Sequence, residues 1–341
     1  MNLPDSEFLS APLGILSLLH LLTLTLHFAA MNVLVGGVVI TLSAALRGRW
    51  QDPELKAIGR MLPAAMAATV TLGVAPLLFL QMVYPRQVYA AAIVSGWFWL
   101  LVVVAVMVAY SALYRSSMQS ERTGRISLPA LGLALAGMVY VSLAYSSVFS
   151  LAEQPSLIRS LYASNPSGWV WNPPTIEGSL RWLHMLLGAI TVGGFFVGWA
   201  GRDRPEIYAT GRAFLLWGML AAAVAGTAYL FALKPILRAF MHTPAIWVLT
   251  VGILLSAGAL HFFLKRTFLL AGSMLFLSML AMVYTRHTVR LLKLAGQFDP
   301  ASWRIAPQWS VFILFLLCFA GMLGLLGYMF RLVARSRKSS A

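Results

Sequence analysis

Residues 26–37 read LHFAAMNVLVGG, and residues 183–194 read LHMLLGAITVGG. In both segments a histidine lies nine residues before the first glycine of a Gly-Gly pair, and both segments lie inside long apolar runs. The two histidines, His27 and His184, are 157 positions apart (184 − 27). The recurrence predicts an internal repeat in a membrane-embedded chain.

The composition excludes a soluble domain, because 60% of the 341 residues are hydrophobic, 10% are charged and the mean hydropathy is +0.81. An apolar run of roughly 20 residues is long enough to cross a bilayer as a helix. The sequence therefore predicts an all-α integral membrane protein with nine transmembrane helices near residues 11–46, 58–83, 91–114, 128–151, 180–200, 212–234, 244–264, 267–288 and 309–333.

The basic residues predict how the chain crosses the bilayer. An odd number of spans puts the two ends on opposite sides, and most of the 25 Lys and Arg residues fall inside if the N-terminus is outside. We therefore expect an N-out, C-in protein of the bacterial cytoplasmic (inner) membrane, with a periplasmic N-terminus. The net charge of +15 is then a topology signal, the lipid bilayer is the partner, and no nucleic acid is expected.

Further matches extend the repeat. Gly-Arg pairs and phenylalanines recur at an offset of 152, at Gly59-Arg60 with Phe79 and at Gly211-Arg212 with Phe231. They predict two pseudo-repeated four-helix bundles, residues 1–151 and 180–288, joined by an outer loop at 152–179. Residues 289–341 then form a connecting loop, the ninth helix and a basic cytoplasmic tail.

Five histidines are candidate ligands, because a histidine inside a membrane usually faces the bundle interior and marks a function. His20 and His27 are two turns apart and share one helix face. His184, His242 and His287 lie toward the same outer side, where solvated or hydrogen-bonded histidines are the alternative. For His20 the alternative is a hydrogen bond or a quinone contact. The single Cys318 allows no cysteine cluster, so any metal must be held by histidine or methionine.

Glycines and aromatic residues add two further hypotheses. Gly36, Gly37, Gly193 and Gly194 either permit close helix packing or make room for a flat macrocycle. The loop NPSGWVWNPP at 165–174 is either a docking surface for a partner or part of an interfacial aromatic belt.

These patches resemble the large, haem-bearing subunit of the cytochrome bd quinol oxidases. The resemblance is carried by His27-Phe28 to Gly36, by His184 to Gly193, and by Gly73-Val74-Ala75 leading to Phe79-Leu80-Gln81. It implies one or two b-type haems and a possible quinone site. His184 then matches a low-spin haem ligand whose sixth ligand is Met241 or His242. His27 matches a second haem position, which is closed by His20, by His287 or by no side chain. Arg181 and Arg238 are candidates to neutralise haem propionates.

Departures from that family favour electron transfer over oxygen reduction. All ten acids fall outside the predicted spans, Ser95 and Val103 stand where the family has carboxylates, and the quinol loop shrinks to about 234–243. We expect a subunit of a quinol or cytochrome oxidoreductase complex, with no catalytic residue of its own assigned. It would pass electrons between the quinone pool and a redox partner, such as a c-type cytochrome or an iron–sulfur protein. A terminal quinol oxidase and a cofactor-free scaffold or transporter are the alternatives.

Overall fold

The computed structural model describes residues 8–49 and 51–339. Within this part, nine helices are long and apolar enough to cross a membrane, which confirms the predicted fold class. They are α1 (Leu13–Leu46), α2 (Pro53–Val83), α4 (Gly96–Thr123), α5 (Leu128–Leu151), α7 (Ile176–Ala200), α8 (Pro205–Ala232), α10 (Ala245–Leu264), α11 (Phe268–Leu294) and α12 (Trp309–Ser339).

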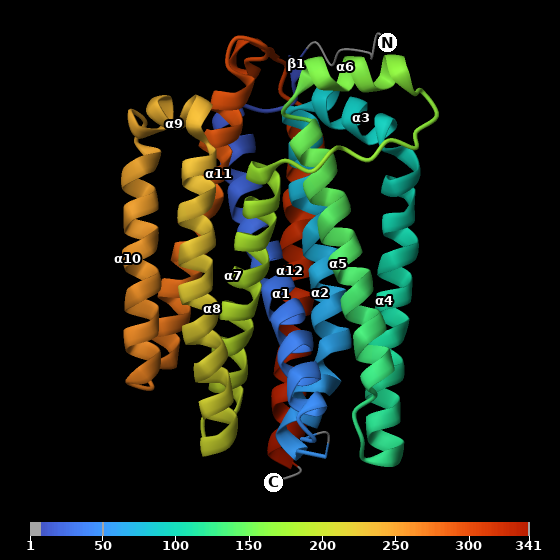
Figure 1. The fold of residues 1–341 in the computed structure, drawn as a ribbon, viewed down its shortest axis with the longest axis vertical. Coiled ribbons are helices and arrows are strands. Elements are labelled where there is room, and N and C mark those ends of the chain that lie inside the picture. The colour runs from blue at the N-terminus through green and yellow to red at the C-terminus, as the bar shows by residue number, and fades with distance from the viewer. Residues whose placement is uncertain (1–7, 50, 340–341) are drawn as a thin grey trace.

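Shorter elements connect these helices. They are α3 (Pro85–Val94), α6 (Pro155–Ser164), α9 (Lys234–Met241), the 3-10 helix η1 (Pro300–Ser302), and the strands β1 (Phe8–Leu9) and β2 (Arg304–Ile305), which pair in parallel. Helices α3, α6 and α9 lie at the end of the molecule where α1 begins, at the top of Figure 1. We call this end the cap end and the opposite one the far end.

Two predicted segments differ from the structure. The third span was expected over 91–114, but α3 ends at Val94 and α4 begins at Gly96. The backbone turns here because Ser95 interrupts the helix, and the Trp97 N–H donates to the carbonyl of Gly168 at 3.2 Å. The connection at 234–243, expected as a loop, contains the helix α9.

Four of the acids that lie outside the predicted apolar spans are nevertheless helical. Glu54, Glu177 and Glu206 stand in the first turns of α2, α7 and α8, and Glu121 stands near the end of α4. Carboxylates in the first turn favour a helix because they complement the positive end of its dipole. The helices therefore extend a turn or more beyond their apolar runs.

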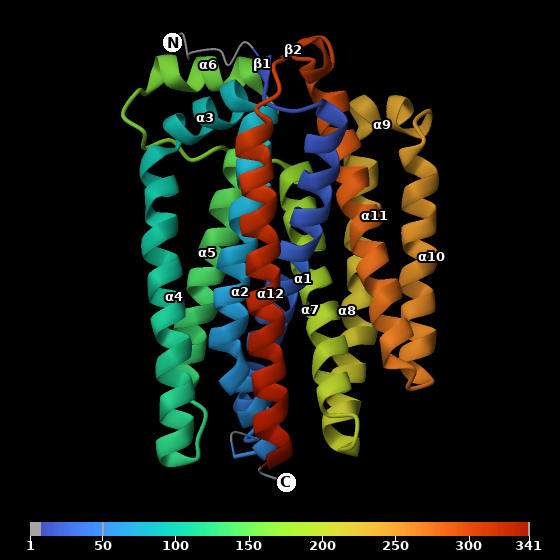
Figure 2. The same cartoon turned by 180° about the vertical axis from the view of Figure 1, so that it is seen from behind.

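The spanning helices pack as antiparallel pairs around α1. Helix α1 pairs with α2, α4 with α5, α7 with α8, and α10 with α11, and α1 also contacts α5, α7 and α11. Seen from behind, α12 lies in front of α1 and α2 (Figure 2), and Phe315 of α12 meets Phe79 edge-on at a centroid distance of 5.1 Å. Large apolar side chains on the outer faces are exposed, as expected for a surface that faces lipid; examples are Trp217, Val224, Trp247 and Leu254.

Glycines permit a very close helix contact where α1 crosses α7. A Cβ added at Gly36 would lie 2.3 Å from the carbonyl oxygen of Ala189, and one added at Gly193 would lie 2.4 Å from the Cα of Gly36. Gly194 is equally close to α8, because its Cβ would lie 2.3 Å from the backbone nitrogen of Leu215. These glycines permit close helix packing, which is the first of the two interpretations given above.

Candidate cofactor site

His27 is held against α2 by a backbone hydrogen bond and a glycine. Its Nδ1 lies 3.0 Å from the carbonyl oxygen of Thr69. Four residues further along α2, Gly73 leaves room for the ring, because a Cβ there would lie 2.9 Å from Cε1 of His27. The Cε1–Nδ1 edge of the imidazole therefore lies close against a helix surface where a larger residue than glycine would clash.

His184 has the same setting on α8. Its Nδ1 lies 2.8 Å from the carbonyl oxygen of Ala222, and a Cβ at Gly226 would lie 2.8 Å from Cε1 and from Nδ1 of the ring. The carbonyl and the glycine are again four residues apart. Each histidine also lies nine residues before a member of the Gly36–Gly193 contact, so the two settings correspond element by element.

The correspondence corrects the register of the predicted repeat. Thr69 matches Ala222 and Gly73 matches Gly226, which gives an offset of 153 (226 − 73) rather than 152. The pairs Gly59-Arg60 and Gly211-Arg212, which are 152 positions apart, are therefore one residue out of register with the histidine partners. Gly211 is pressed against the backbone of Gly198, whereas a Cβ at Gly59 would meet only a methyl of Thr41 at 3.9 Å. Phe79 is buried while Phe231 is 60% exposed.

The hydrogen bond fixes which imidazole nitrogen is available. A carbonyl oxygen only accepts, so Nδ1 must carry a proton, and in the neutral imidazole Nε2 then carries the lone pair. Among the described residues, no hydrogen bond uses Nε2 of His27 or of His184. This is the usual arrangement of a metal-binding histidine, whose second nitrogen donates to a carbonyl or carboxylate.

His20 follows the same pattern one step closer to the cap end. Its Nδ1 lies 3.1 Å from the carbonyl oxygen of Pro76, seven residues beyond Thr69 on α2. The prediction that His20 and His27 share a helix face is confirmed. His20 also lies within electrostatic range of His287 and Arg290 on α11, and Nδ1 of His287 is buried with no hydrogen-bond partner among the described residues.

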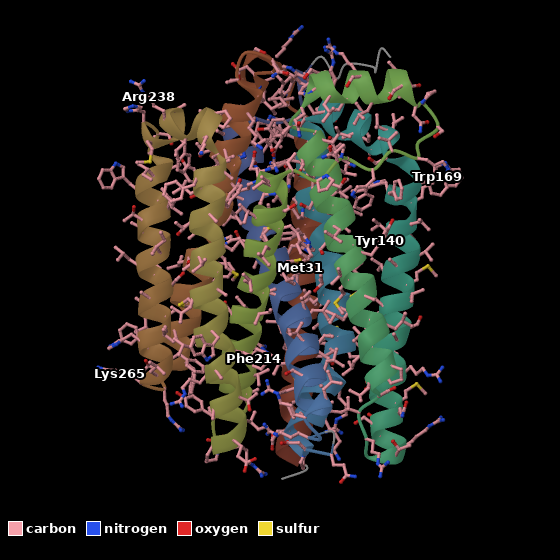
Figure 3. All side chains as sticks on the ribbon, viewed as in Figure 1. Met31, Tyr140, Trp169, Phe214, Arg238 and Lys265 are labelled. Atoms are coloured by element: carbon pink, nitrogen blue, oxygen red, sulfur yellow. The ribbon has the colours of Figure 1, made fainter. Side chains whose placement is uncertain are left out.

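The other predicted ligands are not brought to His184 by any contact between described residues. Met241 and His242 are exposed at the end of α9. Arg238, on the same helix, is exposed and lies at the edge of the molecule (Figure 3). Val103 is 60% exposed on the outer face of α4, and Ser95 is buried at the break before α4.

The aromatic loop at 165–174 is attached to α4 and α5. The indole of Trp169 stacks on Trp97 at a centroid distance of 5.4 Å, and Trp171 meets Phe98 edge-on at 5.0 Å. The side chain of Asn172 donates to the carbonyl of Ser147. Trp169 is still 54% exposed and projects from the side of the molecule near the cap end (Figure 3).

Arg181 belongs to a buried charge cluster that joins the two halves of the chain. At its centre is Glu153, which follows α5 and is 3% exposed. Its carboxylate contacts Arg286 and lies 3.4 Å from both Nε of Arg290 and Nζ of Lys293, and 4.0 Å from Nη1 of Arg181. Lys293 also pairs with Glu177. Arg181 donates in addition to Ser146 and Ser150 of α5. We call these six charged residues the Glu153 cluster.

Sequence reasoning found only Arg181 of this cluster. The spacing of Arg286, Arg290 and Lys293 was the available signal, because residues four and seven apart share a helix face. The acid at the centre is separated from Arg286 by 133 positions, and no local pattern connects them.

The cluster predicts a loss of stability in acid. Burial raises the pKa of the Glu153 carboxyl, but the positive charges of Arg286, Arg181, Arg290 and Lys293 outweigh it and lower the pKa from 4.5 to about 2. A lowered folded-state pKa adds stability above the unfolded value, and that stability is lost as the pH falls from about 4.5 to about 2. The loss is expected to be roughly 3 kcal/mol.

Thermal unfolding in detergent between pH 6 and pH 3 measures this effect. Glu153→Gln should flatten the acid side of the profile, whereas Glu121→Gln, which removes an exposed carboxylate at the far end, should leave it unchanged. Parallel acid profiles for wild type and Glu153→Gln would contradict the prediction.

The donor set suits a cofactor that brings most of its own ligands. Within the described residues, no three His, Cys, Asp or Glu side chains come together as a metal-holding group. A porphyrin supplies four nitrogens and needs only one or two axial side chains, which His27 and His184 offer in duplicate. Comparison with family models, curated proteins and solved structures gives no match to this chain.

Proposed function

We propose that this protein is a b-type haem-carrying membrane subunit, similar to the large subunit of the cytochrome bd oxidases, that passes electrons between the quinone pool and a redox partner. The observation that carries the proposal is the duplicated histidine setting. Two imidazoles, each fixed by a carbonyl and a glycine, present Nε2 as a free ligand. A metal-binding histidine typically donates its second nitrogen to a carbonyl or carboxylate, and the chain contains this arrangement twice.

Haem iron, when bound, accepts and releases one electron. The protein's residues would bind and orient the haem. His27 and His184 would each hold an iron through Nε2, and the Thr69 and Ala222 carbonyls would keep Nδ1 protonated and the rings oriented. His20 and His287, which lie within electrostatic range of each other, are the candidates for a second axial ligand. The apolar helices around the His27 and His184 imidazoles would exclude water from the iron. Excluding water would slow side reactions of the reduced iron.

The proposal includes an orientation and an assembly. The two histidine settings and the Gly36–Gly193 contact support two related four-helix bundles with an axis along the membrane normal. The basic residues at the far end, such as Arg47, Arg115 and Arg204, support a cytoplasmic position there and a periplasmic cap end in a bacterial inner membrane. The exposed Trp169 region at the cap end is then available to a c-type cytochrome or an iron–sulfur protein.

A reduced-minus-oxidised spectrum and a pyridine-haemochrome count on purified wild type, His27→Ala and His184→Ala test the proposal. We expect b-type haem in the wild type, and its loss or conversion to high spin in at least one variant. His261→Ala, at the exposed far end of α10, is the matched control and should keep the wild-type spectrum. A folded but colourless wild type would leave a cofactor-free scaffold, and oxygen consumption with quinol would establish a terminal oxidase.

Gly226→Ala tests the position of the His184 ring without replacing the histidine itself. The added methyl would overlap the ring of His184, so the imidazole must leave the Ala222 carbonyl. Disturbing the partner that orients a metal ligand typically weakens metal binding about 10- to 100-fold. We expect faster haem loss from Gly226→Ala, measured by transfer to a scavenger protein.

Gly188→Ala on α7 is the control, because a Cβ added at this position has no neighbouring atom within 4 Å. Equal haem retention in the two variants would show that the position of the ring is irrelevant.

A further inference from the structure

The Glu153 cluster holds more positive than negative charge. Arg181, Arg286, Arg290 and Lys293 supply four cations, and Glu153 and Glu177 supply two carboxylates, which leaves an excess of two positive charges. Glu153 is buried, and the guanidinium groups of Arg181 and Arg290 are largely shielded from solvent. Charges that are removed from water without full compensation are costly, so an excess of this kind favours a bound anion.

Several buried polar atoms in and around the cluster lack a hydrogen-bond partner within the described part of the chain. They are one acceptor, Oε2 of Glu153, and the groups Nη1 of Arg286, the hydroxyls of Tyr84 and Tyr229, and Nδ1 of His287. Tyr229 lies within electrostatic range of both Arg181 and Arg286. Buried donors are normally satisfied, and an unsatisfied one costs about 1–3 kcal/mol. The cluster therefore offers free donors as well as free charge.

Arg181, by contrast, is already occupied. Its guanidinium donates to the Ser146 carbonyl and to the hydroxyls of Ser146 and Ser150, and it pairs with Glu153. Arg181 therefore contributes charge and fixes the position of Glu153, whereas Arg286 and Tyr229 hold the donors that remain free.

One charged residue and one free hydroxyl of this region lie next to the His184 setting. Arg181 precedes His184 by three residues on α7, and Tyr229 follows Gly226 by three residues on α8. In these antiparallel helices both steps lead toward the cap end, by about 4.5 Å along the axis. Arg181 and Tyr229 thus lie about one helical turn from the His184 setting.

We infer that the Glu153 cluster is a dianion site that binds a pair of carboxylates, with Arg286 and Tyr229 as the donors. Resting on the function proposed above, the carboxylates are the two propionates of the haem that His184 holds. A free dicarboxylate or phosphate is the other source of the same chemistry. The site couples cofactor retention to the contact between the two halves of the chain, because Glu153 follows α5 while Arg181 and Arg286 belong to α7 and α11.

Tyr229→Phe is the most informative variant, because it removes one hydroxyl and no packing. If the hydroxyl binds nothing, its removal should leave stability unchanged or raise it. If it donates to a propionate, haem loss should be about tenfold faster, and the midpoint potential should fall because a negative charge near the iron is less well neutralised. Tyr89→Phe, an exposed tyrosine at the cap end, is the control.

Arg286→Gln should speed haem loss and lower the midpoint potential further than Tyr229→Phe does. Arg159→Gln, at an exposed position on α6, is its control. Wild-type haem retention and potential in a folded Tyr229→Phe protein would overturn the site, whether or not Arg286→Gln folds.

A haem-free wild type would refute the proposed function and leave the anion site to be tested alone. In that case succinate or inorganic phosphate should raise the thermal midpoint of the wild type and have no such effect on Tyr229→Phe. Absence of protection by either anion would overturn the inference as well.

Discussion

Replacing Gly193 by valine is expected to force α1 and α7 apart and to lower the free energy of unfolding by about 3 kcal/mol. The atoms that a side chain at 193 would meet are the Cα and carbonyl carbon of Gly36, at 2.4 and 2.6 Å. Backbone atoms cannot rotate away as a flexible side chain can. The equivalent substitution on the facing helix, Gly36→Val, should have the same effect, because a Cβ at position 36 would meet the backbone of Ala189 and Gly193.

Thermal unfolding of the purified variants in detergent measures the loss. Gly188→Val is the matched control, because it lies on the same helix and a Cβ at 188 meets nothing within 4 Å. Both substitutions change helix propensity equally, so any difference in stability between the two variants is due to the α1–α7 contact. Equal stability of the two variants would mean that α1 and α7 are not in close contact in the membrane.

The crossing also connects the fold to the candidate site. His27 and His184 each lie nine residues from it, about 13 Å along the helix on the cap side. A displaced crossing should therefore disturb both histidine settings together. If the protein binds haem as proposed, we expect Gly193→Val to change the haem spectrum along with the loss of stability.

The sequence predicts the spans well because each one follows from a local property. A run of about 20 apolar residues has few alternatives to crossing the bilayer, and the bounds of α5 agree with the prediction at both ends. The break at Ser95 was missed because apolar residues continue on both sides of it. Hydropathy reports the environment of a segment, and it does not report where the backbone turns.

The candidate site was only partly predictable, for a different reason. The recurrence of His and Gly-Gly located His27 and His184, but their partners Thr69, Ala222 and Gly226 belong to other helices. A register error of one residue turns a helix by about 100°, so the markers Gly59 and Gly211 could not identify the facing atoms. Only the packing of α1 on α2, and of α7 on α8, shows which carbonyl each imidazole reaches.

Glu153→Gln is expected to destabilise the protein by about 3–5 kcal/mol at neutral pH. The glutamine has nearly the same shape but no charge, so four cations would be left with Glu177 as their one carboxylate in the cluster. Arg286 and Arg290 would lose their anionic partner, and their mutual repulsion would be uncompensated. Removing one partner of a buried ion pair costs more than the pair itself contributes, because the other charge remains buried.

The effect of Glu153→Gln should also depend on the salt concentration and on added anions. If the cluster accepts a dianion, the variant gains a third unit of excess positive charge, and an added dicarboxylate should recover part of the lost stability. Glu121→Gln, which removes an exposed carboxylate, should change the unfolding midpoint little and should not respond to the dicarboxylate. A Glu153→Gln protein as stable as the wild type would show that the arginines find other partners, and that Glu153 does not hold the two halves of the chain together.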